Sequence, residues 1–196
     1  MSNRPGVPTT NLDTTLDFMN TSELERGRPV DQLETTRAAL DWLHEHVGID
    51  SSDVAESPAV LARVVRARTA FRALWDAVVE DRPVDRAAVA ELNRVLRHRS
   101  QLELHVASRA DARTAYHLAQ RAVADPVDGA LARLAEPLAL TLGSPEAVER
   151  IRTCADDTCR YVFFDASRTH QRRWCDMASC GNRAKAARHR ARAKSD

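Results

Sequence analysis

Four cysteines near the end of the sequence constrain the fold of this chain more than any other feature. They are Cys154, Cys159, Cys175 and Cys180, and the chain has no others. Each pair has the spacing Cys-x4-Cys, with fifteen residues between the pairs. Two loops that each turn back on themselves can bring four thiolates around one cation, and tetrahedral thiolate sites of this kind hold Zn²⁺. The spacing therefore predicts a small zinc module.

Disulfides are the main alternative use of four cysteines, and they are typical of secreted proteins. The first residues, MSNRPGVPTTN, are polar and lack the apolar centre of a secretory signal. No run approaches the length of about 18 apolar residues that a membrane helix needs. We therefore expect a cytoplasmic protein without membrane contact, in which disulfides are disfavoured. A redox-active dithiol or an iron–sulfur cluster stays open. Four thiolates leave zinc no open position, so we expect one structural ion per chain.

The charges of the chain are divided between its two ends. Residues 150–196 hold 12 of the 29 basic and 5 of the 28 acidic residues, so this part carries +7 and residues 1–149 carry −6. Nearly all basic residues are Arg, which a GC-rich genome would also favour, so only their clustering is informative. A cationic end beside an acidic domain predicts a nucleic-acid partner for that end.

Residues 1–149 carry mainly helical patterns. Apolar residues recur at helical spacing over 31–47, 58–78, 85–97 and 127–142. Asp31 and Glu34 have the spacing of a capping box, which predicts the start of the first helix. Ser57 before Pro58 predicts the start of a long central helix, and Gly143 predicts the end of the last one. No recurring catalytic motif is visible, so we do not expect an enzyme.

A change of period after the third helix predicts a hairpin. Polar and apolar residues alternate over 101–106, and a second strand over 114–118 could pair with the first across the loop 108–112. Pairing could bring His105 and His117 together. They are either ordinary side chains of a half-buried sheet or part of a ligand pocket.

Asn20 and Thr21 are the other candidates for a ligand pocket. They follow a short segment of apolar residues of the kind that a core buries. Their polar groups either satisfy the backbone at a turn or line a small-molecule site.

The residues between the cysteine pairs predict a miniature domain that needs its metal to fold. Residues 161–164 predict a strand. Trp174 directly precedes Cys175, where its ring could cover the thiolates and keep water from them.

The segment after Cys180 predicts a basic helix over 183–194, with Asn182 as its cap. A small apolar stripe would dock this helix on the finger, formed by Ala184, Ala187 and Ala191. The candidate nucleic-acid contacts are Arg172, Arg173, Arg183, Lys185, Arg188, Arg190, Arg192 and Lys194. Zinc with four thiolates carries a net charge of −2, so the first three could instead neutralise the site. The others have almost no acidic neighbours in sequence, which favours phosphate contact over a solvated tail.

The C-terminal motif resembles the CGNR zinc finger. The resemblance rests on Cys154-x4-Cys159, Ser167-Arg168, Arg172-Arg173-Trp174-Cys175 and Cys180-Gly181-Asn182-Arg183-x-Lys185. Only Thr169-His170-Gln171 looks atypical, in a linker that supplies no ligand.

The N-terminal part is similar to the ABATE domain, which usually precedes this finger. Asn20-Thr21, Asp31-x-Leu33 and Trp42-Leu43 stand in the expected order. The resemblance implies a bacterial, stress-induced transcription regulator.

Together these observations predict a mainly α protein with a small antiparallel β element (α+β) and a C-terminal four-cysteine zinc finger. Residues 1–149 would form a helical ABATE-like domain that dimerises or senses a small-molecule effector. Residues 150–196 would form the CGNR-type finger with its basic helix. The expected function is zinc-dependent DNA binding in transcription regulation. An RNA-binding or protein-interaction module, and a redox sensor or small-molecule-binding protein, are the alternatives.

Overall fold

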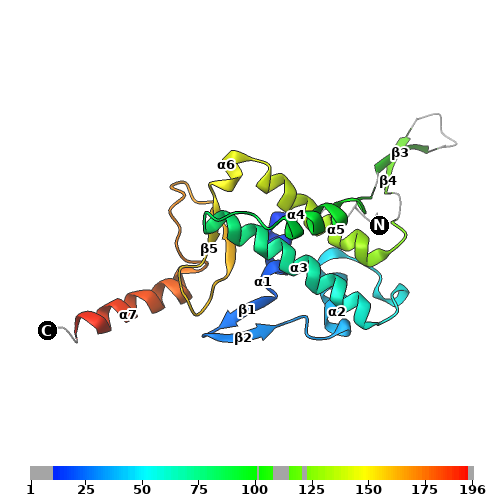
Figure 1. Cartoon of the computed structure of the whole chain (residues 1–196). Coiled ribbons are helices and arrows are strands. Elements are labelled where there is room, and N and C mark those ends of the chain that lie inside the picture. Colours follow the sequence, from blue (N-terminus) through cyan, green and yellow to red (C-terminus); the bar gives the residue numbers. More distant parts are fainter. Residues whose placement is uncertain (1–10, 101, 108–114, 121–122, 194–196) are drawn as a thin grey trace.

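A computed structural model describes residues 11–100, 102–107, 115–120 and 123–193 of the chain (Figure 1). The helices are α1 (Leu12–Asn20), α2 (Thr36–Val47), α3 (Pro58–Val79), α4 (Arg86–Leu96), α5 (Pro126–Leu142), α6 (Pro145–Val148) and α7 (Asn182–Arg192), with short helices η1 (Ser51–Asp53) and η2 (Met177–Gly181). The strands are β1 (Ser22–Glu25), β2 (Arg28–Asp31), β3 (Leu102–Ala107), β4 (Ala115–Gln120), β5 (Ile151–Thr153) and β6 (Val162–Phe164). Each strand is paired with its neighbour in sequence, in antiparallel two-stranded sheets. The predicted mainly α class with small antiparallel elements is confirmed.

The predicted start of the central helix is confirmed at α3. The Ser57 hydroxyl accepts from the Val60 amide at 3.3 Å, and Pro58 occupies the first turn, where its missing N–H costs nothing. The expected end of the last helix of the domain is also confirmed, because Gly143 is the C-cap of α5. α3 contacts α1, α2, α4, α5 and β5, so it is the central element of the domain.

The expected capping box at Asp31 and Glu34 is wrong. α2 begins five residues later than predicted, at Thr36, and the Thr35 hydroxyl caps it by accepting from Ala38. Asp31 instead ends β2 and pairs with Arg68 of α3, with both Nη to Oδ distances at 2.6 Å. The Asp31 carboxylate therefore pairs with the buried Arg68 guanidinium and does not cap a helix as its spacing predicted.

The core lies between the helices and is apolar. Phe18 of α1 packs against Phe71 of α3 and Trp42 of α2, with ring centroids 5.9 and 5.4 Å apart. α5 buries Leu131, Leu134 and Leu138 completely, which fits its predicted helical spacing.

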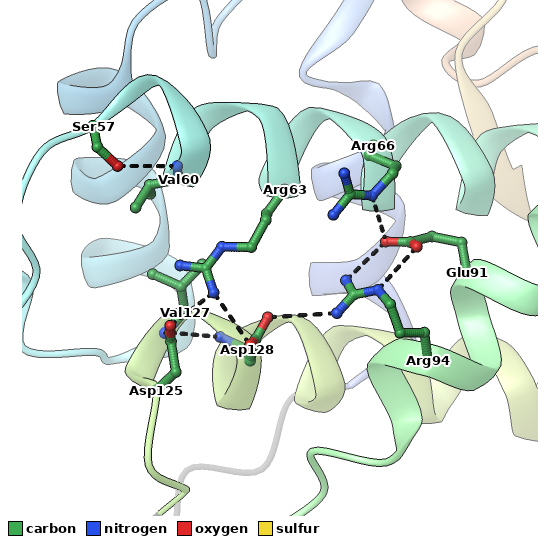
Figure 2. Close-up of polar contacts among 9 residues, drawn as sticks. All are labelled: Ser57, Val60, Arg63, Arg66, Glu91, Arg94, Asp125, Val127 and Asp128. Atoms are coloured by element: carbon green, nitrogen blue, oxygen red, sulfur yellow. Dashed lines mark hydrogen bonds and ion pairs between the residues drawn. The ribbon is translucent and has the colours of Figure 1, made fainter.

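Ion pairs join α3, α4 and α5 at the side of this core (Figure 2). Arg63 of α3 reaches both Asp125 and Asp128 at the start of α5, at 2.7 and 3.1 Å. Glu91 of α4 pairs with Arg66 of α3 and with Arg94 in its own helix, at 3.2 and 2.8 Å. Because these pairs are partly exposed, each adds little to the stability of the domain.

The predicted hairpin is confirmed as β3 and β4. Their register places His105 directly opposite His117. The side chains of this hairpin and the expected loop 108–112 lie outside what the structure describes. In Figure 1 the hairpin projects from the end of the molecule opposite α7.

A second hairpin, β1 and β2, occupies residues that were not predicted as strands. Its tip is a tight turn in which Arg26 and Gly27 have positive φ angles of 51° and 83°. The Gly27 amide donates to the Thr158 carbonyl at 3.1 Å, so the hairpin touches the first cysteine loop.

The β5–β6 hairpin belongs to the core of the helical domain as well as to the finger. Ile151 and Val162 are buried in that core. The Trp75 indole of α3 donates to the Arg152 carbonyl of β5 at 3.0 Å. The first half of the finger is therefore fixed to the helices, while the cysteines and the aromatic residues around them form a separate cluster.

Candidate zinc centre and basic helix

The four cysteine sulfurs converge between the β5–β6 hairpin and the start of α7. All four Sγ atoms lie within 4.8 Å of one another. Cys175 Sγ is 3.6 Å from both Cys159 Sγ and Cys180 Sγ. Sulfurs at the corners of a tetrahedral zinc site, with Zn–S of about 2.3 Å, stand about 3.8 Å apart. The residues present therefore fit one Zn²⁺ with four thiolates and no open position.

The surroundings of the thiols also call for a cation. Burial raises the pKa of Cys159 to about 11, and it raises the pKa of Cys175 as well. Cys154 and Cys180 are buried, and the sulfurs are too close to carry four negative charges unaided. A divalent ion would hold all four as thiolates, which is how a structural zinc contributes to folding.

Asp156 organises the first cysteine loop, from Cys154 to Cys159. One carboxylate oxygen accepts from the Thr158 amide at 3.0 Å and from its hydroxyl at 2.6 Å. The Cys159 amide donates to the Asp156 carbonyl at 2.8 Å, which closes the turn. These bonds let four intervening residues return the chain to the metal.

Asp176 plays the equivalent role in the second loop, where it is the N-cap of η2 and accepts from the Ser179 amide at 2.6 Å. The expected capping by Asn182 is wrong. η2 runs directly into α7, and the Asn182 side chain donates back to the Ala178 carbonyl at 3.0 Å. Gly181 lies against Met177 and Trp174, where an added Cβ would clash with the Met177 side chain and stand 3.2 Å from the indole Cδ1.

Arg183 serves the metal site. Its Nε donates to Asp156 Oδ2 at 2.9 Å, and its Nη2 donates to Cys180 Sγ at 3.0 Å. One guanidinium thus joins the two cysteine loops and balances part of the thiolate charge.

Arg172 is also used inside the finger. Its Nε donates to the Trp174 carbonyl at 2.9 Å, and its Nη2 donates to the Cys175 carbonyl. Its guanidinium lies 4.9 Å from the centroid of the Phe163 ring. The exposed Arg173 stacks on Trp174 at 5.3 Å. Arg172 therefore shapes the second loop, while Arg173 stays accessible beside it.

Apolar and aromatic side chains cover the metal site, as expected for Trp174. The indole packs with Phe163, Tyr161 and the four cysteines in one small cluster. Such a cover keeps water from the thiolates.

Asp165 holds the linker between the loops, and no sequence pattern pointed to it. The carboxylate is fully buried and accepts from the Ser167 and Arg172 amides at 3.0 and 2.8 Å. Burial would raise the pKa of this carboxyl, but hydrogen bonds from Ser167 and Arg172 lower it to about 2. Ser167 of the CGNR resemblance thus anchors the linker.

α7 extends away from the rest of the molecule (Figure 1). The predicted alanine stripe faces the finger at the start of the helix, where Ala184 and Ala187 line a hollow with Ala155 and Trp174. Only Ala184 of the two is half-buried, and Ala187 is exposed. The side chain of Ala191 lies outside what the structure describes. Lys185, Arg188, Arg190 and Arg192 are exposed as well, and Lys194 lies beyond the described residues. None of these four cations forms an ion pair within the part of the chain that the structure describes. They are available to a partner, unlike Arg172 and Arg183.

The candidate pocket residues are not brought together. Asn20 is buried, and its side-chain amide both donates to the Val162 carbonyl and accepts from the Val162 amide, at 2.9 and 2.8 Å. The Thr21 hydroxyl donates to the Phe18 carbonyl at 2.7 Å and accepts from Arg68 at 3.0 Å. Both residues thus satisfy polar groups of the protein, and the β3–β4 hairpin projects away from α1, the helix that ends at Asn20 (Figure 1).

Comparison with protein-family models agrees with this architecture. Residues 12–145 match the ABATE model, described as "Putative stress-induced transcription regulator". The chain belongs to the ABATE family. Residues 150–193 match the CGNR zinc finger, so the ABATE domain is followed by the finger whose cysteines form the metal site. Neither description names an enzyme. A comparison with curated proteins found no match to the chain.

The described helices of this ABATE protein include none that is long and apolar enough to cross a membrane.

Proposed function

We propose that this chain is a cytoplasmic, zinc-dependent, DNA-binding transcription regulator in which α7 is the DNA contact. The ABATE domain would supply dimerisation or sense a small effector. The family descriptions support a zinc-finger regulator, and the contact with DNA is our inference from the finger.

The proposal rests on a difference between two groups of basic residues in the finger. Arg172 and Arg183 are committed to the cysteine loops, whereas the cations of α7 are exposed and unpaired within the described chain. When such side chains neutralise phosphates, the counterions condensed on the nucleic acid are released, which supplies a large part of the affinity.

The shape of the finger suits a duplex. α7 has 11 residues, and a helix of that length is about 16 Å long. The start of α7 would be held by the zinc site, by Arg183 and by η2, so the direction of the helix is fixed. A helix fits the major groove of B-DNA, about 12 Å wide, with basic side chains on both sides reaching the phosphates. The same cations would serve RNA less well, because the deep groove of A-form RNA is too narrow for a helix.

Selection of bound fragments from genomic DNA tests this proposal. The zinc-loaded chain is compared with a variant in which Lys185, Arg188, Arg190 and Arg192 are all Gln. We expect the parent chain, and not the variant, to enrich a shared sequence. If neither enriches any sequence, the chain is not a specific regulator. If structured RNA displaces duplex DNA in competition, the RNA-binding alternative holds instead.

Measuring the zinc content of the chain before and after mild oxidant distinguishes a structural metal site from a redox sensor. A structural site should keep one zinc per chain after mild oxidant, because its thiolates are covered and bound. Loss of zinc together with loss of DNA binding under mild oxidant would favour a redox sensor.

A further inference from the structure

A hollow in the helical domain has chemistry that the proposed DNA contact does not use. It has a volume of about 340 Å³ and lies among the end of α1, the start of β1 and the second half of α3. This volume is within the range of small-molecule sites, which starts at about 300 Å³.

Three guanidinium groups line the hollow, from Arg68, Arg72 and Arg82. Arg68 is only 5% exposed and is fixed by Asp31 and Thr21. Arg72 is held by Asp76, which also lines the hollow, with its Nε 3.0 Å from both carboxylate oxygens. Their positions are therefore set before any ligand enters, which lowers the entropic cost of binding.

Several donors around the hollow remain unused. Arg72 Nη1 and both Nη atoms of Arg82 make no hydrogen bond to any described residue. The hydroxyls of Ser22 and Thr69, which line the same space, are likewise without a partner there. Guanidinium groups with spare N–H donors bind carboxylates and phosphates through paired hydrogen bonds.

We propose that this hollow binds a small organic anion, a carboxylate or phosphate attached to a compact apolar body. Arg72 and Arg82 would hold the anionic group, with Thr69 and Ser22 as additional donors. Met19 and Ala73 supply the apolar part of the lining. This site differs from the pair of histidines and the Asn20–Thr21 segment, and it gives the sensing role proposed for the ABATE domain a location.

The hollow is connected to the zinc finger by the same side chains. Arg72 Nη2 donates to the Arg160 carbonyl at 2.8 Å, directly after Cys159. Glu80 pairs with Arg82 at 2.7 Å and with Arg160 at 3.3 Å. An anion bound by Arg82 would compete with Glu80 for that guanidinium and so weaken the chain of contacts from Arg82 through Glu80 to Arg160. Binding would therefore loosen the first cysteine loop, a regulatory role that rests on the proposed function of the finger.

Calorimetric titration of the zinc-loaded full chain tests the site, with phenyl phosphate, benzoate and inorganic phosphate as probes and benzamide as the neutral control. We expect phenyl phosphate or benzoate to bind, inorganic phosphate to bind more weakly, and benzamide not to bind. Arg82→Gln should weaken binding about tenfold, the loss of roughly one charge-assisted hydrogen bond. Arg82 is exposed, so this variant should fold normally. Arg97→Gln, an exposed arginine of the α4 C-cap, is the matched control and should bind like the parent chain.

Other outcomes overturn the proposal. If none of the three anions binds, or if Arg82→Gln binds as well as Arg97→Gln, the hollow is not an anion site. If inorganic phosphate and phenyl phosphate bind equally well, the proposed ligand does not need an apolar body.

Hydrogen exchange tests the link to the finger. With phenyl phosphate bound, amides of residues 155–160 should exchange faster, and unchanged exchange would contradict the coupling. A Lys185→Gln, Arg188→Gln variant should keep anion binding even if DNA binding is lost. This variant separates failure of the anion site from failure of the proposed DNA contact.

Discussion

Asn20 and Val162 are joined by two hydrogen bonds, although 142 positions separate them in the chain. The side-chain amide of Asn20, at the end of α1, satisfies both the N–H and the C=O of Val162 in β6. Both residues are buried, so water cannot replace either bond. Through this contact the zinc finger is built on the helical domain instead of being tethered to it.

Replacing Asn20 by Ala should destabilise the chain by about 2 to 4 kcal/mol, because it leaves two buried backbone groups without partners. Urea unfolding followed by circular dichroism measures the change. Asn93→Ala, on the exposed side of α4, is the control and should stay close to the parent stability. Equal effects of the two substitutions would mean that the Asn20 contact does not stabilise the junction.

Removal of zinc should affect the two halves of the finger differently. The β5–β6 hairpin is held by Ile151, Val162 and Trp75 without help from metal, whereas the second cysteine loop and the base of α7 depend on Cys175 and Cys180. We expect a strong chelator to change the fluorescence of Trp174 while most helical ellipticity remains. Cys180→Ser should behave in the same way. Loss of all helical signal on chelation would show that the helical domain also depends on zinc.

The cysteine spacing predicted the metal site because the ligands of each loop are neighbours in sequence. The helix starts at Ser57 and Asp85 were predictable for the same reason, since each cap bonds amides two or three residues ahead. Asn20 could not be assigned, because its partner in β6 is remote and a single sequence does not show that contact.

Asp31 shows how a remote partner overrides a local pattern. Its hydrogen bond with Arg68 lowers the pKa of the Asp31 carboxyl below its ordinary value. The Asp31–Arg68 pair therefore stabilises the folded chain fully above the unfolded-state pKa of about 3.9. This stabilisation is lost as the pH falls through the lower pKa that Asp31 has in the folded chain.

Asp31→Asn should lower the free energy of unfolding by about 3 kcal/mol at neutral pH, because it leaves the buried Arg68 without its charged partner. The difference in unfolding free energy between the variant and the parent chain should become smaller below a pH of about 4, where Asp31 of the parent chain also loses its charge. Glu45→Gln, an exposed change in α2, controls for net charge at each pH. A difference that does not depend on pH would contradict the ion pair.

Arg183 and Lys185 should separate metal binding from DNA binding. Arg183→Gln removes the donor to Cys180 and the link to Asp156, so zinc affinity should fall about tenfold or more. Lys185→Gln should leave zinc affinity unchanged and weaken DNA binding. Competition with a chromophoric chelator measures the first effect, and fluorescence anisotropy with labelled duplex measures the second. Equal zinc affinities in the two variants would contradict the role given to Arg183.

The direction of α7 was beyond prediction for a different reason. Its alanine spacing is compatible with docking, but the helix continues directly from η2, whose position is set by Cys175, Cys180 and Asp176. The metal site therefore decides where the helix points, and only the start of the alanine stripe, at Ala184, is half-buried.

The salt dependence of DNA affinity tests the central claim most directly. If α7 and its neighbours neutralise five or six phosphates, a plot of log affinity against log salt should have a slope of about −5. Lys185→Gln should reduce that slope by about 1. Anisotropy measured with the zinc-loaded chain over a range of salt concentrations gives both values. A slope near zero, or one that Lys185→Gln leaves unchanged, would contradict α7 as the DNA contact.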